Sequence, residues 1–210
     1  KIPIVRDVDY TLLWGALSIA ALVIAFLVYR WRQARKYEAL MRSKNLELER
    51  MSQIDHLTRV SNRQKADSDI RAECARAARH GREFSLAMLD VDHFKRINDD
   101  FGHPVGDQAL VALCGVVAAN IRKGDAFGRW GGEEFVLLCP ETNLGQAEAL
   151  AEKLRARIES HDFGGDFRMT CSIGVVQFKH DESNDSLVQR ADAALYQAKH
   201  LGRNRVHVAE

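Results

Sequence analysis

Cysteine is scarce in this chain, and none of it is arranged for disulfide or metal chemistry. Among 210 residues the four cysteines are Cys74, Cys114, Cys139 and Cys171. They form no CxxC pair and have no histidine-rich spacing around them, and these are the patterns that indicate disulfide frameworks or zinc sites. The sequence therefore predicts neither disulfides nor zinc, and we expect reduced cysteines in the core.

An excess of charge of either sign is also missing. The chain has 30 lysines and arginines against 29 aspartates and glutamates, which leaves a formal net charge of +1. Without a basic excess, no overall field attracts nucleic acid, so we expect no nucleic-acid partner. The chain has no internal repeat and no low-complexity segment, and this points to one ordinary globular domain with an additional segment.

The additional segment is a run without charge. Residues 11–29, TLLWGALSIAALVIAFLVY, are 19 uncharged residues. At about 1.5 Å per residue they match the bilayer hydrocarbon core of about 30 Å, and we interpret them as a transmembrane helix. The alternatives are a signal peptide and a buried core helix. The run is too long for a signal peptide, and no small-residue cleavage pattern follows it.

The flanks of this run differ in charge and predict its orientation. Four basic residues follow at once, whereas the basic residues of the other flank are offset by acids: Arg30, Arg32, Arg35 and Lys36 against Lys1, Arg6, Asp7 and Asp9. The positive-inside rule then places the C-terminal part in the cytoplasm. The chain begins with lysine, and its first dozen residues resemble the tail that joins a periplasmic solute-binding-like sensor to its membrane helix. We therefore expect residues 1–10 to be the periplasmic tail of a truncated sensor.

Residues 30–54 predict a linker helix that leaves the membrane. From Gln33 to Ile54 the sequence is rich in helix formers and lacks glycine and proline. A 4-7-3 spacing, typical of one seam of a short parallel coiled coil, relates Tyr37, Met41, Leu48 and Met51. Lys44 falls at a seam position, so a single solvated helix is the alternative. Both interpretations predict a continuous rod to the domain.

Residues 55–210 alternate helical and extended patterns. After Ser61 and Asn62, which can cap a helix, we expect the following elements: a helix to about His80, a strand at 84–91, helices at 94–101 and 105–122, strands at 125–129 and 134–139, a helix at 143–160, a strand at 168–178, a helix at 184–200 and a strand at 205–208. This alternation predicts an α/β (α+β) sandwich with one mixed sheet covered by helices.

Two acidic motifs are predicted to meet at one end of this sheet. The strand 84–91 runs into DVD, which directs Asp90 and Asp92 to one side and Val91 to the other. In GGEEF, residues 131–135, the glycines permit a tight hairpin from which Glu133 and Glu134 project. If the two strands are neighbours, Asp90 and Glu133 converge on one hard cation, most simply Mg²⁺. The alternative for either motif alone is a solvated hairpin tip or strand end.

A third motif, FKRINDDFGHPVGDQAL at 94–110, lies between them. Phe94 and Lys95 begin a helix whose N–H groups and lysine charge can cradle phosphates. Asn98 and Asp107 offer the acceptors that a purine edge requires, and a carboxylate pairs with the N1–H and N2 amine of guanine. The alternative is a turn former and a helix N-cap.

Together these motifs resemble the bacterial GGDEF domain, the diguanylate cyclase module, from Asp55 to Val206. The matching segments are DHLTRVSNR at 55–63, DVDHFKRINDDFGHPVGD at 90–107, GGEEF at 131–135, SIGV at 172–175 and ADAALYQAKHLGRNRV at 191–206. One departure is in the first motif, where the family usually has Gly-Leu-Pro and this chain has Arg59, Val60 and Ser61. That segment orients the incoming helix and lies outside the active-site motifs.

The resemblance implies a fold like the palm of nucleotidyl cyclases and polymerases, and the joining of two GTP into cyclic di-GMP with release of two pyrophosphates. It implies that two Mg²⁺ or Mn²⁺ ions are bound by Asp90, the carbonyl of Val91 and Glu133. Either Glu133 or Glu134 helps to deprotonate the attacking 3′-hydroxyl. The remaining implied roles are guanine recognition by Asn98 and Asp107, and contact with the β- and γ-phosphates by Lys95, Lys199 and Arg203.

The resemblance also implies an assembly and a regulation. Because one domain holds one GTP, two domains must face each other, so we expect a homodimer, single-pass in the bacterial inner membrane with its catalytic domain in the cytoplasm. RKGD at 122–125 matches the RxxD motif of the family, and Arg122 and Asp125 are expected to bind cyclic di-GMP and inhibit the enzyme. Arg129 assists that site or the neighbouring active site. Outside the family context, RxxD is usually a surface ion pair.

Two other functional classes are alternatives to the enzyme. A catalytically silent receptor for GTP or cyclic di-GMP is expected to have a damaged metal motif, whereas Asp90, Glu133 and Glu134 are all present. A membrane-anchored interaction module with merely solvated acids predicts no stabilisation by GTP. The intact motifs favour the enzyme.

Overall fold

The computed structural model describes residues 11–51, 53–164, 167–180 and 182–209. The expected periplasmic tail, residues 1–10, therefore lies outside the described residues. The chain divides into two compact units, Lys1–Met51 and Ser52–Glu210, which are described separately.

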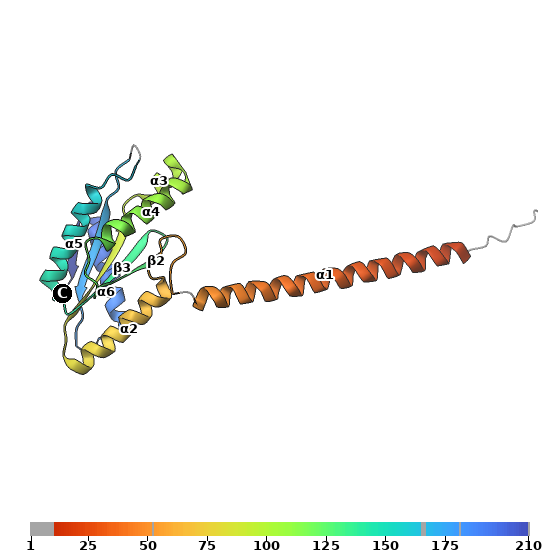
Figure 1. Ribbon diagram of the computed structural model, residues 1–210, viewed down its shortest axis with the longest axis horizontal. Coiled ribbons are helices and arrows are strands. Elements are labelled where there is room, and N and C mark those ends of the chain that lie inside the picture. The colour runs from red at the N-terminus through yellow and green to blue at the C-terminus, as the bar shows by residue number, and fades with distance from the viewer. Residues whose placement is uncertain (1–10, 52, 165–166, 181, 210) are drawn as a thin grey trace, which may run out of the picture. The chain divides into compact units, whose positions relative to one another are not determined.

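The first unit is built on one helix, α1, which runs without interruption from Thr11 to Met51 (Figure 1). The apolar run and the linker predicted after it thus belong to a single element. Within it, the segment Trp14–Glu38 contains an 18-residue stretch with a mean hydropathy of 1.7, and the helix is long and apolar enough to cross a membrane, by length and composition alone. None of that segment is buried, which argues against a core helix. Tyr37, Met41 and Lys44 are exposed, and the coiled coil stays a prediction.

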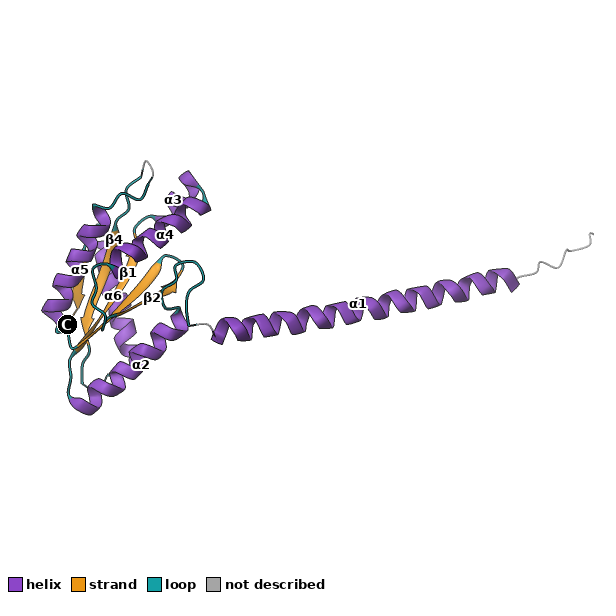
Figure 2. Ribbon diagram, in the orientation of Figure 1, coloured by secondary structure: helices purple, strands orange, loops and turns teal. Residues whose placement is uncertain are grey.

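The second unit contains five helices and five strands in the residues that the structure describes (Figure 2). In chain order they are α2 (Arg63–His80), β1 (Phe84–Val91), α3 (Phe94–Phe101), α4 (His103–Ala118), β2 (Ala126–Gly131), β3 (Glu134–Pro140), α5 (Leu144–Glu159), β4 (Cys171–Gln177), α6 (Asn184–His200) and β5 (Val206–Ala209). The predicted bounds of β1, α3 and α6 agree with these. The predicted helix 105–122 begins earlier, at His103, because Pro104 fits the first helical turn, and it ends at Ala118.

The strands form one mixed sheet in the order β2-β3-β1-β4-β5. The central strand β1 is antiparallel to both β3 and β4, and β5 joins the edge parallel to β4. This confirms the predicted fold class of a mixed sheet covered by helices. Because β1 lies between two other strands, the acids at its end face the ends of both neighbours.

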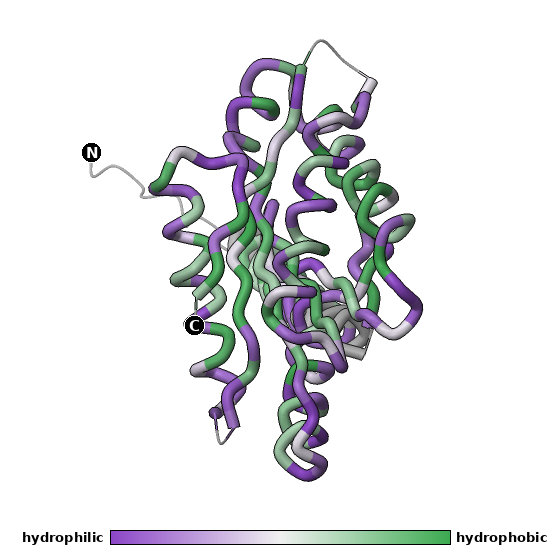
Figure 3. Tube along the Cα trace, turned by 90° about the vertical axis from the view of Figure 1, so that its left-hand side faces the viewer, coloured by the Kyte–Doolittle hydropathy of each residue, from purple (hydrophilic) through white to green (hydrophobic). Residues whose placement is uncertain are grey.

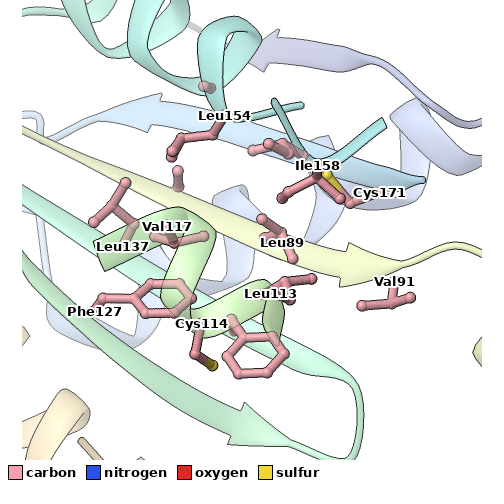
Figure 4. Packing of buried hydrophobic residues seen from close by; sticks show 14 of the residues in the cluster. Leu89, Val91, Leu113, Cys114, Val117, Phe127, Leu137, Leu154, Ile158 and Cys171 are labelled. Carbon is pink, nitrogen blue, oxygen red and sulfur yellow. The ribbon is translucent and has the colours of Figure 1, made fainter. Parts of the chain in front are cut away.

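Helices cover both faces of the sheet, and β1 is buried along its whole length. One face packs against α3, α4 and α5, where alternate β1 residues such as Leu89 and Val91 meet Leu113, Val117 and Ile158 (Figure 4). On the other face Leu86 and Met88 pack against α2 and α6. Burial of each large apolar side chain contributes roughly 1.5–3 kcal/mol, so this double packing fixes the position of β1.

Hydropathy along the chain follows this layering. In Figure 3 the helices of the domain alternate between hydrophobic and hydrophilic residues, as expected for elements that bury only one face. Side chains cap the first turns of α2 and α6. Asn62 accepts a hydrogen bond from the Lys65 N–H, and Ser183 accepts one from the Ser186 N–H. Caps and amphipathic faces thus fix the helices that surround the end of β1.

Candidate active site at the end of the central strand

Asp90 is the acid around which the site is built. Asp90 points to the same side of β1 as Leu86 and Met88, because residues two apart in a strand share one face. It therefore lies on the sheet face covered by α2 and α6. The residue is only 7 % exposed, and its Oδ2 lies 2.8 Å from Lys199 Nζ of α6. Burial raises the pKa of Asp90 to about 6; Lys199 opposes this rise, whereas the nearby carboxylates of Glu133 and Glu134 add to it. Three acids are therefore close enough to repel one another.

The GGEEF hairpin brings the other two acids to Asp90. Gly132 has a φ of +37°, which a residue with a side chain rarely adopts, and this glycine makes the turn between β2 and β3. The Val91 N–H donates to the Glu133 carbonyl oxygen at 3.3 Å, so the turn is joined to the end of β1. In the β1–β3 register the direct partner of Asp90 is Glu134, and directly opposed side chains share one face of a sheet.

The donors expected for a metal are oxygen atoms that suit a hard cation. Carboxylates of Asp90 and Glu133 and the carbonyl of Val91 match the chemistry that Mg²⁺ prefers. Among the described residues no three His, Cys, Asp or Glu side chains gather closely enough to hold a metal ion as they stand. Lys199 supplies the positive charge beside Asp90 in this structure. The residues thus fit a divalent cation chemically, with Lys199 in contact with one of its expected ligands.

Asp92 has a different environment from Asp90, although the sequence directs both to one side. Its carboxylate accepts hydrogen bonds from Thr170 Oγ1 at 2.7 Å, Ser172 Oγ at 2.6 Å and the Asn204 N–H at 3.0 Å. The residue is 5 % exposed. Asp92 therefore joins the end of β1 to the start of β4 and to the turn before β5, and sequence reasoning gave it no such role.

The residues expected to read guanine lie side by side. A Cβ built on Gly106 would fall 2.0 Å from Asn98 Oδ1, so the missing side chain of this glycine makes the space that the Asn98 amide fills. Asp107 follows Gly106 on α4 and is exposed. Asn98 of α3 therefore packs against α4 at Gly106, the residue directly before Asp107.

The start of α3 carries the residues that are expected to contact phosphates. His93, with a φ of +54°, precedes the helix and makes no side-chain cap, so the first N–H groups receive no capping side chain from it. Phe94 is 8 % exposed and packs in the core, so only its backbone is suited to a ligand. Lys95 is exposed beside it.

Lys199 and Arg203 lie at the end of α6 and in the turn that follows. Lys199 is in the last turn of the helix and contacts Asp90. Arg203 has a φ of +62°, and its N–H donates to the Ala198 carbonyl oxygen at 3.1 Å. The Arg203 side chain is exposed.

Arg122 and Asp125 form an ion pair in the segment before β2. Arg122 Nε lies 3.0 Å from Asp125 Oδ1, and Arg122 Nη2 donates to the Pro140 carbonyl oxygen and to Thr142 Oγ1. The Asp125 side chain is only 2 % exposed, whereas that of Arg122 is 57 % exposed. The guanidinium is thus both anchored and accessible.

The structure does not bring Arg129 to this pair. Arg129 is paired with Phe135 in the sheet, whereas Arg122 contacts Pro140 at the other end of β3. Five residues of strand at about 3.3 Å each separate these two ends. Arg129 instead donates to the Gly132 carbonyl oxygen at 2.8 Å and lies 3.1 Å from Asp55 Oδ1, so it neighbours the GGEEF turn. Its role in either site stays a prediction.

A cleft of about 740 Å³ adjoins the acids on the α2–α6 face. Its lining includes Glu134 and Met88, together with Asp67 of α2 and Asp192 of α6. The guanidinium of Arg63 lies 4.9 Å above the ring of Trp130 in its wall. Of the three site acids, Glu134 therefore borders open space on this side of the sheet.

Comparison with known proteins identifies the family of the chain. Residues 52–205 match the family model described as diguanylate cyclase, GGDEF domain. The chain belongs to the GGDEF-domain family. This confirms the resemblance drawn from the five sequence motifs, and the second unit, which begins at Ser52, carries the GGDEF fold.

Curated relatives of this GGDEF chain are named diguanylate cyclases. The chain is 44 % identical over 158 residues to diguanylate cyclase DgcP of Pseudomonas aeruginosa, covering 74 % of the chain and 24 % of that relative. It is 49 % identical over 127 residues to diguanylate cyclase DgcM of Escherichia coli, covering 60 % of the chain and 31 % of the relative. The chain thus spans roughly a quarter to a third of these proteins.

Solved GGDEF structures share the fold. The GGDEF domain of DgcB from Caulobacter crescentus in complex with c-di-GMP aligns with a TM-score of 0.71 and 36 % identity, covering 75 % of this chain and 93 % of that one. Diguanylate cyclase SiaD in complex with its activator SiaC, from Pseudomonas aeruginosa, aligns with a TM-score of 0.73 and 36 % identity, covering 96 % and 80 %.

Proposed function

We propose that this chain is a diguanylate cyclase that joins two GTP molecules into cyclic di-GMP and releases two pyrophosphates. The observation that carries the proposal is the meeting of Asp90 with the GGEEF acids at the end of β1. Asn98 of α3, which packs against Gly106, and the adjacent Asp107 of α4 support a guanine nucleotide as the substrate. Family membership of residues 52–205 supports the same reaction.

The reaction forms two ester bonds. In each, a 3′-hydroxyl oxygen of one GTP attacks the α-phosphorus of the other, the bond from that phosphorus to the bridging oxygen breaks, and pyrophosphate leaves. The hydroxyl proton passes to a carboxylate, for which Glu133 and Glu134 are the candidates beside Asp90. Lys95, Lys199 and Arg203 supply positive charge to the β- and γ-phosphates.

Two Mg²⁺ or Mn²⁺ ions would be held by Asp90, the Val91 carbonyl and Glu133. When bound, such ions polarise phosphate oxygens and neutralise the charge that develops on the attacking and leaving oxygens. Burial and repulsion from Glu133 and Glu134 keep the carboxylate of Asp90 costly even beside Lys199, and this supports a further positive charge at the site.

The proposed enzyme acts as a homodimer anchored in the bacterial inner membrane by a single helix, with its catalytic domain in the cytoplasm. One domain offers one Asn98–Asp107 pair, so two domains are needed to present two GTP molecules to each other. The apolar length of α1 and the exposed Arg30, Arg32, Arg35 and Lys36 that follow it support the anchor and its orientation. Cyclic di-GMP bound at Arg122 and Asp125 is proposed to inhibit the enzyme.

Synthesis by the full chain in detergent tests the proposal. The chain is incubated with GTP and Mg²⁺ while product is removed, and cyclic di-GMP and pyrophosphate are quantified. We expect product from the native chain and from Glu141→Ala, an exposed acid at the far end of β3, and none from Glu133→Ala. GTP binding without product would instead support a silent receptor. No stabilisation by GTP at all would support an interaction module.

A further inference from the structure

We propose that Asp92 is a positioning residue that holds the turn 201–205, and with it Arg203, in place for the triphosphate end of GTP. This inference rests on the proposed function, because it concerns the β- and γ-phosphate contacts of that same site. Asp92 itself does not touch the substrate in this proposal. It acts through the backbone of the turn.

The three donors to the Asp92 carboxylate come from two separated parts of the chain, residues 170–172 and Asn204. Oδ1 accepts from Ser172 on β4, and Oδ2 accepts both from Thr170 just before β4 and from the Asn204 N–H. The Asp92 N–H donates in turn to the Thr170 carbonyl oxygen at 2.9 Å. With three donors and 5 % exposure, this carboxylate is occupied by the protein and not directed at solvent.

The turn that Asp92 holds has a backbone that needs support. Gly202, Arg203 and Asn204 have consecutive φ values of +115°, +62° and +44°. Residues with side chains rarely adopt this left-handed region, and they remain in it only where surrounding contacts fix them. The Asn204 N–H bonded to Asp92 is one such contact, and the Ile173 N–H bonded to the Arg205 carbonyl oxygen at 2.9 Å is another.

The side chain of Asn204 holds the turn from the other side. Its Oδ1 accepts from Arg155 Nη1 at 2.8 Å, and its Nδ2 donates to Glu159 Oε1 at 2.7 Å. Both partners lie on α5. Asn204 is therefore held between the end of α5 and Asp92, so the direction in which the neighbouring Arg203 projects is set by Asp92 together with α5.

This arrangement connects Asp90 with the turn that carries Arg203, and the proposed reaction needs both. Asp92 is two residues from Asp90 on the same chain segment, while the turn follows directly on the helix end that carries Lys199. Lys199 already contacts Asp90. Asp92 thus fixes the position of Arg203 relative to Asp90. Loss of the hydrogen bond from Asn204 to Asp92 is expected to weaken only the contacts with the β- and γ-phosphates.

Ligand binding separates this role from general stability. The full chain in detergent with Mg²⁺ is titrated with a GTP analogue that has a methylene group in place of the α,β-bridging oxygen, and with GMP, which lacks the β- and γ-phosphates. For Asp92→Ala we expect analogue affinity to fall about tenfold and GMP affinity to stay unchanged. Asp92→Asn should restore most of the loss, because its amide oxygen can accept from Asn204 while its NH₂ group donates to Ser172.

The outcomes are distinct. Equal weakening of both ligands in Asp92→Ala, or no weakening of either, overturns the proposal. If Asp92→Ala does not fold, Ser172→Ala decides, since it removes one donor from the same carboxylate; we expect a smaller loss confined to the analogue, and any other pattern overturns the inference. A native chain that binds neither ligand contradicts the proposed function itself, whereas the Asp92 result is read only from a native chain that binds both.

Discussion

Lys199 Nζ lies 2.8 Å from Asp90 Oδ2 and so joins the last turn of α6 to the end of β1 by an ion pair. Asp90 is nearly buried and has two glutamates beside it, and burial with this repulsion raises its pKa to about 6 despite the lysine. An aspartate in such surroundings costs stability at neutral pH. Its presence is therefore better explained by the charge that it would bind than by the fold.

Asp90→Asn is expected to stabilise the metal-free protein. The pKa of Asp90 in the folded state is about 6, above the ordinary 3.8, so the folded protein holds this proton more tightly than the unfolded chain does. The stability that results is fully present below pH 3.8 and is lost as the pH rises through about 6. In the presence of a chelator the variant should therefore unfold at a higher temperature than the native chain at pH 8, by a margin that shrinks at pH 5. Thermal unfolding at both pH values measures this.

Asp100→Asn is the matched control, because that acid is exposed and forms an ion pair with Arg96 on its own helix. It should leave both unfolding temperatures nearly unchanged. An Asp90→Asn variant that is less stable at pH 8 would show that the ion pair with Lys199 outweighs burial.

The fold was predictable where patterns are local. The apolar run of β1 and the capped, periodic α2 and α6 are determined by neighbouring residues, and their predicted bounds agree closely with the structure. The register was not predictable. A shift by one residue exchanges the two faces of a strand, and an irregularity between Arg129 and Gly131 alters the pairing beside the turn. That Glu134 is the one directly opposite Asp90 therefore required the structure.

The environment of the site depended on contacts between distant segments. Asp92 and Asp90 look equivalent in the sequence, yet the donors to Asp92 come from residues about 80 to 112 positions away. Asn98 and Gly106 are close in sequence, but only the α3–α4 packing shows that one fills the space left by the other. Spacing alone gives no information on such tertiary contacts.

Removal of Arg129 should destabilise the domain and loosen the GGEEF turn. Arg129 and Asp55 have side chains that are 16 % and 15 % exposed, and Arg129 also donates to Gly132. We expect Arg129→Met to lower the free energy of unfolding by about 1.5–3 kcal/mol, in urea at pH 7. Arg96→Met is the control, since its exposed pair with Asp100 is worth at most about 1 kcal/mol.

The Arg129 effect should depend on pH. Burial alone would raise the pKa of Asp55, but hydrogen bonds from Thr58 and Arg129 outweigh it and hold the pKa below the ordinary 3.8. This contribution is present above that value and is lost as the pH falls through the folded-state pKa. The difference between native and Arg129→Met should therefore shrink below about pH 4, and a constant difference would contradict the ion pair.

Arg59→Gly should stabilise the domain. Arg59 has a φ of +61° in the first motif, and its side chain is exposed. Glycine removes the steric cost of this conformation but loses more entropy on folding, which leaves a net gain of about 0.5–1 kcal/mol. Urea unfolding measures the gain. Ala75→Gly, at an exposed site within α2, should instead cost about 1 kcal/mol, and equal effects would exclude backbone strain at Arg59.

Arg122→Ala tests product inhibition. The guanidinium is anchored to Asp125 and to the end of β3 but is more than half exposed, so it can receive a phosphate. We expect the cyclic di-GMP concentration that halves the rate of synthesis to rise about tenfold. Lys123→Ala, an exposed cation next in the chain, is the control. Equal inhibition of the native chain and Arg122→Ala would leave Arg122 as a surface ion pair only.

Gly106→Ala should impair guanine recognition without disturbing the rest of α4. Alanine favours a helix over glycine by about 1 kcal/mol, yet the new Cβ would fall 2.0 Å from Asn98 Oδ1 and 3.2 Å from the ring of Phe94. The Asn98 amide must therefore move from the position that it occupies against Gly106. We expect GTP affinity to fall about tenfold, while the expected helix stabilisation is absent because the displaced side chains offset it.

Gly115→Ala provides the matched control in the same helix. A Cβ on Gly115 meets nothing within 4 Å, so this variant should gain about 1 kcal/mol of stability and bind GTP as the native chain does. Titration with GTP and urea unfolding of both variants give the comparison. If Gly106→Ala is stabilised as Gly115→Ala is and still binds GTP normally, then the position of Asn98 does not matter for the base. Loss of affinity in Gly106→Ala alone would show that the packing of α3 on α4 places the amide that reads guanine.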